Sequence, residues 1–148
     1  MADFFEEIIR FAMAKEEEAA AFYEMAAKMT KDPMRTVFGE LAATERGHRA
    51  MLANWRQETA AKRQEEAVED LKISDYLVEA PVSGKMSYQD VLIVAMKREE
   101  RALALYRTLA QRSRDEGSRR LFERLAEEES KHKLRIESEY DRVILAEA

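Results

Sequence analysis

Hydrophobic residues recur along most of the chain at intervals of three and four, which is the period of an amphipathic helix. This pattern fills four segments, and we predict helices over residues 3–29, 33–66, 87–113 and 118–146. Asp3 and Ser87 are suitable N-caps, since each has an acidic residue three positions later. Pro33 suits a first helical turn, and residues 115–118 contain turn-forming residues. The sequence therefore predicts two helical hairpins, residues 3–66 and 87–146.

A segment with a different pattern, residues 68–86, lies between the two hairpins. It contains Pro81 and Gly84, and its apolar residues are expected to lie against the helices: Leu71, Ile73, Tyr76, Leu77 and Val82. About 20 extended residues span up to ~66 Å, whereas a helix of 26 residues is ~39 Å long. The segment can therefore cross the full length of a bundle. We predict a single all-α domain over residues 1–148, a four-helix bundle of two hairpins joined by a long crossover.

The two hairpins are repeats of each other. The string F-x-x-L-A-x-x-E-x-x-H occurs at Phe38–His48 and again at Phe122–His132, and its two histidines are the only ones in the chain. A second string, residues 12–17, matches residues 95–100 and pairs Glu16 with Glu99. Each hairpin thus supplies one lone glutamate and one E-x-x-H pair. In a helix, residues three apart share a face, so Glu45 and His48, or Glu129 and His132, can bind one metal ion.

The neighbours of these glutamates along each helix face are apolar, which indicates that the carboxylates point into the protein. These neighbours are Ala12, Ala19, Tyr23 and Ala27 for Glu16; Ala95, Ala102, Tyr106 and Ala110 for Glu99; Phe38, Leu41, Ala42 and Leu52 for Glu45; and Phe122, Leu125, Ala126 and Ile136 for Glu129. Glu17 and Glu100 are the competing candidates, but charged residues follow them at seven positions' distance, so we assign them to solvent.

Buried ionised glutamates are costly unless they are paired or bound to a metal. Two divalent cations would balance four carboxylates, and a glutamate from each of two helices plus E-x-x-H from each of the other two is a known di-metal pattern. We predict two metal ions bound by Glu16, Glu45, His48, Glu99, Glu129 and His132. These donors suit iron or manganese, and zinc can also bind. The alternative interpretation is that each glutamate lies on the surface and each E-x-x-H is a local contact.

Two tyrosines follow the lone glutamates by seven residues. Tyr23 and Tyr106 could donate a hydrogen bond to a ligand carboxylate, or they could be ordinary core aromatics. Both interpretations place them on the same helix face as Glu16 and Glu99.

Composition narrows the classes of partner. The net charge is −5, there is no basic block and there is no cysteine, so nucleic-acid binding, disulfides and cysteine-bound metal centres are not expected. No apolar run approaches the ~20 residues of a membrane span, and acidic residues near the N-terminus do not fit a signal peptide, so we expect a cytoplasmic protein.

Helices that begin with apolar residues on several sides favour a homodimer, unless residues 68–86 cover them. These residues are Phe4, Phe5, Ile8, Ile9 and Phe11, and Val91, Leu92, Ile93 and Val94.

The repeated strings around Glu16, Glu45, Glu99 and Glu129 resemble the ferritin-like superfamily and, within it, the rubrerythrin-related di-iron proteins. The resemblance extends over residues 13–140. It implies that Glu16, Glu45 and His48 serve one side of a di-iron centre, that Glu99, Glu129 and His132 serve the other, and that Glu45 and Glu129 bridge the metals. Rubrerythrins also carry a cysteine-containing rubredoxin domain, which we do not expect here. They tend to have a further glutamate where this chain has Ala102, so efficient peroxide reduction is not expected. The sequence predicts no fifth short helix of the kind that ferritin shells use, so we do not expect this chain alone to build a storage shell.

The predicted function is oxidation of iron(II) by O₂ or peroxide at this centre, with electrons returned by an external donor. One alternative is a protein that binds or handles iron without turnover. Another is a structural helical dimer whose site holds zinc or is vestigial.

Overall fold

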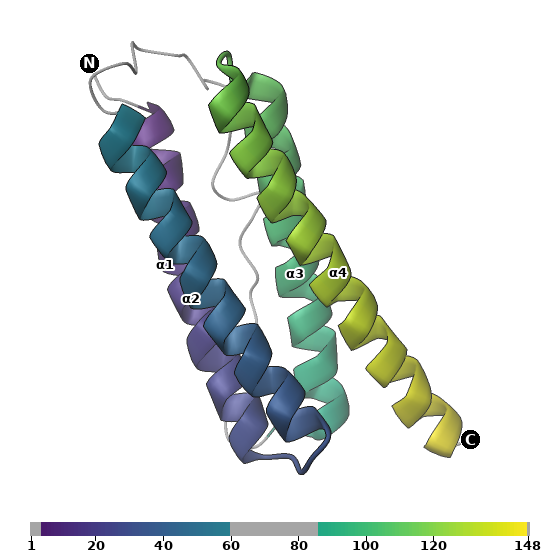
Figure 1. The fold of residues 1–148 in the computed structure, drawn as a ribbon. Helices are drawn as coiled ribbons and strands as arrows, with labels where there is room; N and C mark the ends of the chain where they lie inside the picture. The colour runs from purple at the N-terminus through teal and green to yellow at the C-terminus, as the bar shows by residue number, and fades with distance from the viewer. Residues whose placement is uncertain (1–3, 60–85, 148) are drawn as a thin grey trace. The chain divides into compact units, whose positions relative to one another are not determined.

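The computed structural model describes residues 4–59 and 86–147, and within these ranges it contains four helices and no strand. The helices are α1 (Phe4–Lys28), α2 (Met34–Thr59), α3 (Tyr88–Arg112) and α4 (Glu116–Glu147), as Figure 1 shows. The all-α prediction is confirmed. The predicted end of the second helix, residues 60–66, lies outside the described residues, as do residues 68–85 of the predicted crossover.

Side-chain caps determine where the helices begin. At α3, the Ser87 hydroxyl accepts a hydrogen bond from the Asp90 backbone N–H, and the Asp90 carboxylate accepts one from the Ser87 N–H, as predicted. Before α2, Asp32 accepts hydrogen bonds from the backbone N–H and the hydroxyl of Thr36, at 3.1 and 2.6 Å. The predicted start of the last helix at Ser118 was wrong. Asp115 Oδ2 accepts from the Ser118 N–H at 2.9 Å, so Asp115 caps α4 two residues earlier.

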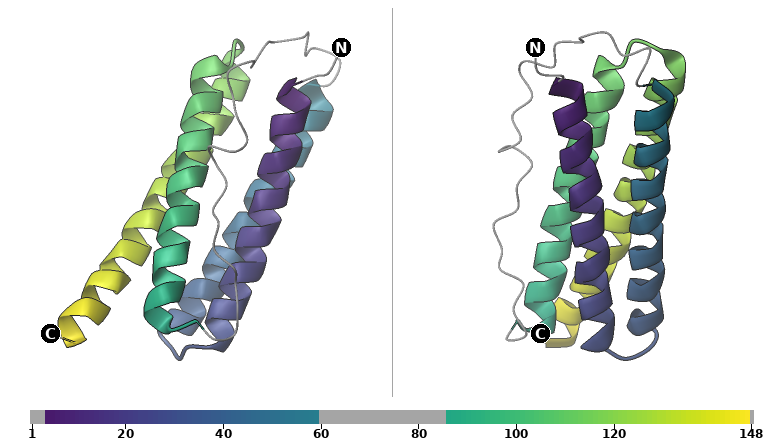
Figure 2. Two further views of the ribbon diagram at one scale, coloured as in Figure 1. Left: turned by 180° about the vertical axis from the view of Figure 1, so that it is seen from behind. Right: turned by 90° about the vertical axis from the view of Figure 1, so that its left-hand side faces the viewer.

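The helices form two compact units, each an antiparallel hairpin. The first unit contains α1 and α2, and the second contains α3 and α4 (Figures 1 and 2). α4 has 32 residues against 25 in α3, and its C-terminal end diverges from α3. The boundaries of the single domain predicted from the sequence remain a prediction.

Each unit has a core of large apolar side chains interleaved with alanines. In the first unit the Tyr23 ring stacks on Phe38 across the hairpin, with 6.0 Å between ring centroids. Ala20 and Ala26 on α1 are fully buried, and such small side chains let α2 approach closely. In the second unit, five fully buried side chains come from both helices: Leu92, Leu109, Phe122, Leu125 and Ile136.

The apolar residues that favoured a homodimer are largely buried within one chain. Ile8 and Ile9 in α1 and Val91, Leu92 and Val94 in α3 are all buried, whereas Phe11 and Ile93 are half-buried. The side chains of Phe4 and Phe5 lie outside the described ones. The homodimer therefore stays a prediction, with fewer side chains to support it. None of the described helices is long and apolar enough to cross a membrane.

A buried carboxylate joins the start of α3 to the C-terminal half of α4. Glu139 is 8% exposed and accepts hydrogen bonds from the Tyr88 hydroxyl at 3.0 Å and from Arg142 Nε and Nη2 at 3.0 and 2.5 Å. The hydrogen bonds from Arg142, together with the one from Tyr88, lower the pKa of Glu139 although burial opposes the shift. The ionised carboxylate is thus stabilised in the folded state.

We expect Glu139→Gln to lower the free energy of unfolding by about 1–2 kcal/mol at pH 7, because hydrogen bonds to a charged group contribute about 1.5–3 kcal/mol and glutamine retains some of them. A carboxyl whose pKa is lowered by folding stabilises the protein above its ordinary pKa of 4.5, and this contribution disappears as the pH falls through the lower folded value. The difference between variant and wild type should therefore shrink below about pH 4.5. Guanidinium unfolding at several pH values measures it. Glu137→Gln, which removes the 2.7 Å pair with Lys133 on a more exposed face, is the control and should cost less.

Candidate metal centre

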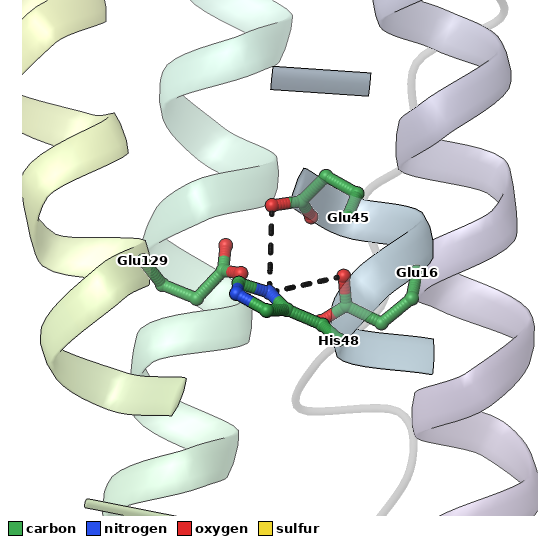
Figure 3. Close-up of side chains that lie close together, drawn as sticks. All are labelled: Glu16, Glu45, His48 and Glu129. Carbon is green, nitrogen blue, oxygen red and sulfur yellow. Dashed lines mark ion pairs between the residues drawn. The ribbon is translucent and has the colours of Figure 1, made fainter. Parts of the chain in front are cut away.

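Three predicted ligands come together in the first unit. α1 supplies Glu16, and α2 supplies Glu45 and His48, one helical turn apart. All three are buried, with exposures of 1–2%. His48 Nδ1 lies 3.6 Å from Glu16 Oε2 and 3.7 Å from Glu45 Oε1, and Figure 3 shows both carboxylates directed at the imidazole.

The second unit repeats this arrangement. α3 supplies Glu99, and α4 supplies Glu129 and His132. His132 Nδ1 lies 3.7 Å from Glu99 Oε2 and 3.9 Å from Glu129 Oε2. The two carboxylates are buried, whereas the His132 side chain is 11% exposed against 2% for His48. The two clusters therefore have the same donors but differ in access.

Helical periodicity explains why these side chains point inward. Glu16 and Glu99 occupy buried stripes, while their neighbours Glu17 and Glu100 are exposed, as the argument from helix faces predicts. Each E-x-x-H pair follows buried apolar residues of the same helix, which place that side of the helix in the core. These residues are Phe38 and Leu41 in α2, and Phe122 and Leu125 in α4.

The spacing of the donors suits a metal ion. In each cluster the two carboxylates and the imidazole offer ligand atoms within 4.8 Å of one another. Nitrogen and oxygen ligands about 2.1 Å from one ion, at angles of 90–120°, lie roughly 3.0–3.6 Å apart. The observed separations of 3.6–3.9 Å need to close by only a few tenths of an ångström to reach this range. Each donor set thus fits a divalent metal in geometry and in ligand type.

The charges of the clusters also favour metal binding. Each cluster holds two carboxylates among apolar side chains, where ionised groups lose most of their hydration. A divalent cation would balance two carboxylates, and a neutral imidazole is a common third ligand. Within residues 4–59 and 86–147, the acidic and histidine side chains that gather closely enough to hold a metal consist solely of the six predicted residues.

The hydrogen bond predicted from each of the two tyrosines to a ligand carboxylate remains a prediction. Tyr23 and Tyr106 are each 1% exposed, on the same helices as Glu16 and Glu99. Tyr23 packs on Phe38 and edge-on against Phe22, so it contributes to the core in either interpretation.

The sequence did not predict that the side chains of the two histidines differ in solvent exposure. The repeated strings are alike at every ligand position, so they carry no signal for it. The exposure of His132 depends on how neighbouring side chains pack, which a local motif does not encode.

Comparison with known proteins agrees with this geometry. The family model described as Rubrerythrin matches residues 7–140. Among solved structures, a hypothetical protein from Pyrococcus furiosus has the same fold, with a TM-score of 0.76 and 23% sequence identity over 94% of this chain and 89% of that one. A search of curated proteins found no match.

The match to the family model extends over nearly the whole chain and includes all six predicted ligands. Together with the likeness in fold, it establishes a ferritin-like four-helix bundle. The chain belongs to the rubrerythrin family.

Proposed function

We propose that the six residues form one di-iron centre that reacts with O₂ or peroxide. The observation that carries the proposal is the presence of two matching Glu-Glu-His donor sets, one in each hairpin, whose four carboxylates are buried. Joined in one bundle, they supply the four glutamates and two histidines of the known di-metal pattern. Family membership supports the same conclusion.

In this proposal each hairpin holds one side of the centre. Glu16 and His48 would hold one ion, Glu99 and His132 would hold the other, and Glu45 and Glu129 would be shared between the two, as the family resemblance implies. When bound, the two iron(II) ions supply the two electrons that, with two protons, reduce hydrogen peroxide to two water molecules, and an external donor then returns the electrons.

The protein's own residues bind, orient and exclude water. The apolar side chains beside the carboxylates keep bulk water away and strengthen their attraction for cations. The hydroxyls of Tyr23 and Tyr106 hold ligand carboxylates in position by hydrogen bonds. The 11% exposure of His132 makes the second hairpin the side on which small oxidants approach the centre.

We expect the protein to bind two metal ions per chain, about 3.5–4 Å apart, as in other two-metal sites. Glu45→Ala combined with Glu129→Ala should abolish binding, because it removes one buried carboxylate from each donor set. Glu17→Ala combined with Glu100→Ala is the matched control and should retain both ions, since these two residues are exposed. Elemental analysis after anaerobic iron(II) loading gives the stoichiometry, and anomalous scattering gives the positions. One ion per chain, or equal losses in the two double variants, would contradict the assignment.

Catalysis is tested separately from binding. With iron loaded and ascorbate as the external reductant, we expect each centre to consume more than one equivalent of hydrogen peroxide or O₂, and the Glu45/Glu129 double variant to consume none above background. Stopped-flow assays and oxygen electrodes measure this consumption. A single equivalent per centre would instead favour an iron-binding protein without turnover. This outcome is worth testing because the chain has Ala102 where rubrerythrins tend to have a further glutamate. Stoichiometric zinc that resists exchange for iron would favour the structural alternative.

We also propose that the chain forms a homodimer, based on half-buried Phe11 and Ile93 near the starts of α1 and α3. Light scattering at micromolar concentration should give twice the chain mass of 17.2 kDa. Phe11→Ser combined with Ile93→Ser should shift the equilibrium towards the monomer, because it removes the apolar contact. A wild-type mass of 17.2 kDa would reject the dimer, and a particle of many subunits would reject the expectation that this chain builds no storage shell.

A further inference from the structure

A groove of about 700 Å³ lies between α3 and α4 in the second unit. Its floor is apolar and consists of Leu103, Ala110 and Ala126, which are 6–8% exposed. Arg107 on α3 and the α4 residues Glu123 and Lys131 are among the polar side chains along its rim. Ten residues line this space, which we call the α3–α4 groove; the other four are Gln111, Arg119, Glu127 and Ser130. None of the ten lining residues belongs to the proposed metal centre.

In the first unit, two arginines cross between the helices in the equivalent region. Arg46 on α2 reaches across to α1 and pairs with Glu24 and, at 3.5 Å, with Glu17. This pairing lowers the pKa of Glu24 and raises the pKa of Arg46. Arg35 Nε also donates across the hairpin, to the backbone carbonyls of Ala27 and Thr30, both at 3.0 Å. The outer side of the α1–α2 hairpin is thus bridged by two cationic side chains.

Among residues 86–147 of the second unit, neither bridge has a counterpart. The internal repeat aligns Arg46 with Ser130, whose side chain is too short to cross, and aligns Glu24 with Arg107. Arg35 aligns with Arg119, which instead lies beside Glu116 and Glu123 of its own helix, at 3.6 and 3.8 Å. The groove is open because both cross-helix contacts of the first unit have been replaced.

The side chains along the rim of the groove are also longer than those at the equivalent positions of the first unit. Three positions one helical turn apart on α2, Gly39, Ala43 and Gly47, have small or no side chains. Their counterparts on α4 are Glu123, Glu127 and Lys131, all of which line the groove. Long side chains at these positions form a wall along an apolar floor, which deepens the space available to a ligand.

The charges on the rim leave one cation unbalanced. Lys131 pairs with Glu127 at 3.3 Å, and Arg119 lies close to Glu123, so these four charges are compensated within α4. Nearby Lys133 is hydrogen-bonded to Glu137. Among the described residues, Arg107 forms no ion pair. Its guanidinium is therefore available to bind an anionic group placed over the apolar floor.

We propose that the α3–α4 groove binds a small organic anion, a monocarboxylate with an apolar chain. The carboxylate pairs with Arg107, and the chain lies on Leu103, Ala110 and Ala126. The size decides between a small molecule and a protein partner. Ligand pockets usually measure about 300–1,000 Å³, whereas a stable protein interface involves about 20–30 residues on each side. A groove of about 700 Å³ lined by ten residues matches the smaller ligand.

Sodium octanoate is the test ligand, titrated into the zinc-loaded 148-residue chain and followed by ¹⁵N-edited NMR and calorimetry. We expect saturable binding to one site, with shifts concentrated in residues 103–111 and 119–131. Octan-1-ol, which has the same chain without the charge, should bind at least about tenfold more weakly, because a hydrogen bond to a charged group contributes about 1.5–3 kcal/mol. Equal binding of the two compounds, shifts elsewhere, or no saturation at 10 mM would overturn the proposal.

Two variants test the residues. Arg107→Gln should weaken octanoate binding about tenfold or more, because it removes the charged donor, while Arg124→Gln, which removes an exposed arginine on α4 outside the groove lining, should leave binding unchanged. Arg107→Glu combined with Ser130→Arg rebuilds the Glu24–Arg46 bridge of the first unit and should abolish binding. Circular dichroism and metal stoichiometry of that variant should match the wild type, since both positions lie outside the six ligands. Wild-type affinity in either groove variant would refute the assignment, and it would leave the proposed di-iron function untouched.

Discussion

The structure depends on the burial of four carboxylates in a protein interior made largely of alanine, leucine and aromatic side chains. Glu16, Glu45, Glu99 and Glu129 are each at most 2% exposed, and ionised groups at such positions are costly unless opposite charges lie close by. One imidazole lies among the carboxylates of each hairpin, with its Nδ1 atom 3.6–3.9 Å from carboxylate oxygens. The helix faces, the alanines that allow close packing and the position of each histidine can all be understood as means of holding these carboxylates for cations.

Duplication explains why this costly arrangement occurs twice, and divergence explains why the hairpins differ. On the inner faces the repeat retains glutamate, histidine and tyrosine at matching positions. On the outer faces, Arg46 and Glu24 are replaced by Ser130 and Arg107, so a bridged surface becomes an open one. Changes at exposed positions cost little stability, whereas changes at the ligands would leave buried charges unbalanced. Exposed positions are consequently where a second binding function can arise beside the first.

The second unit has a further buried carboxylate, whose countercharge comes from the protein itself. Glu139 is neutralised within the protein by Arg142 and receives a hydrogen bond from Tyr88, so it needs no external cation. The carboxylates of the two clusters lie 3.6–3.9 Å from imidazole nitrogens. Glu139 thus fastens two helices of one hairpin together, whereas the cluster carboxylates lie beside a metal-binding type of side chain.

The sequence by itself determined the features that helical geometry makes local. A period of 3.6 residues places Glu16 inside and Glu17 outside, and three-residue spacing puts Glu45 and His48 on one face. Ser87 and Asp90 likewise marked a helix start, whereas residues 115–118 were predicted as a turn although Asp115 caps α4. Only the tertiary structure decided which polar side chains outside the predicted metal ligands meet across a hairpin: Arg46 with Glu24, and Tyr88 with Glu139. Such contacts join residues 22 to 51 positions apart, and they depend on how two helices pack, which no local pattern specifies.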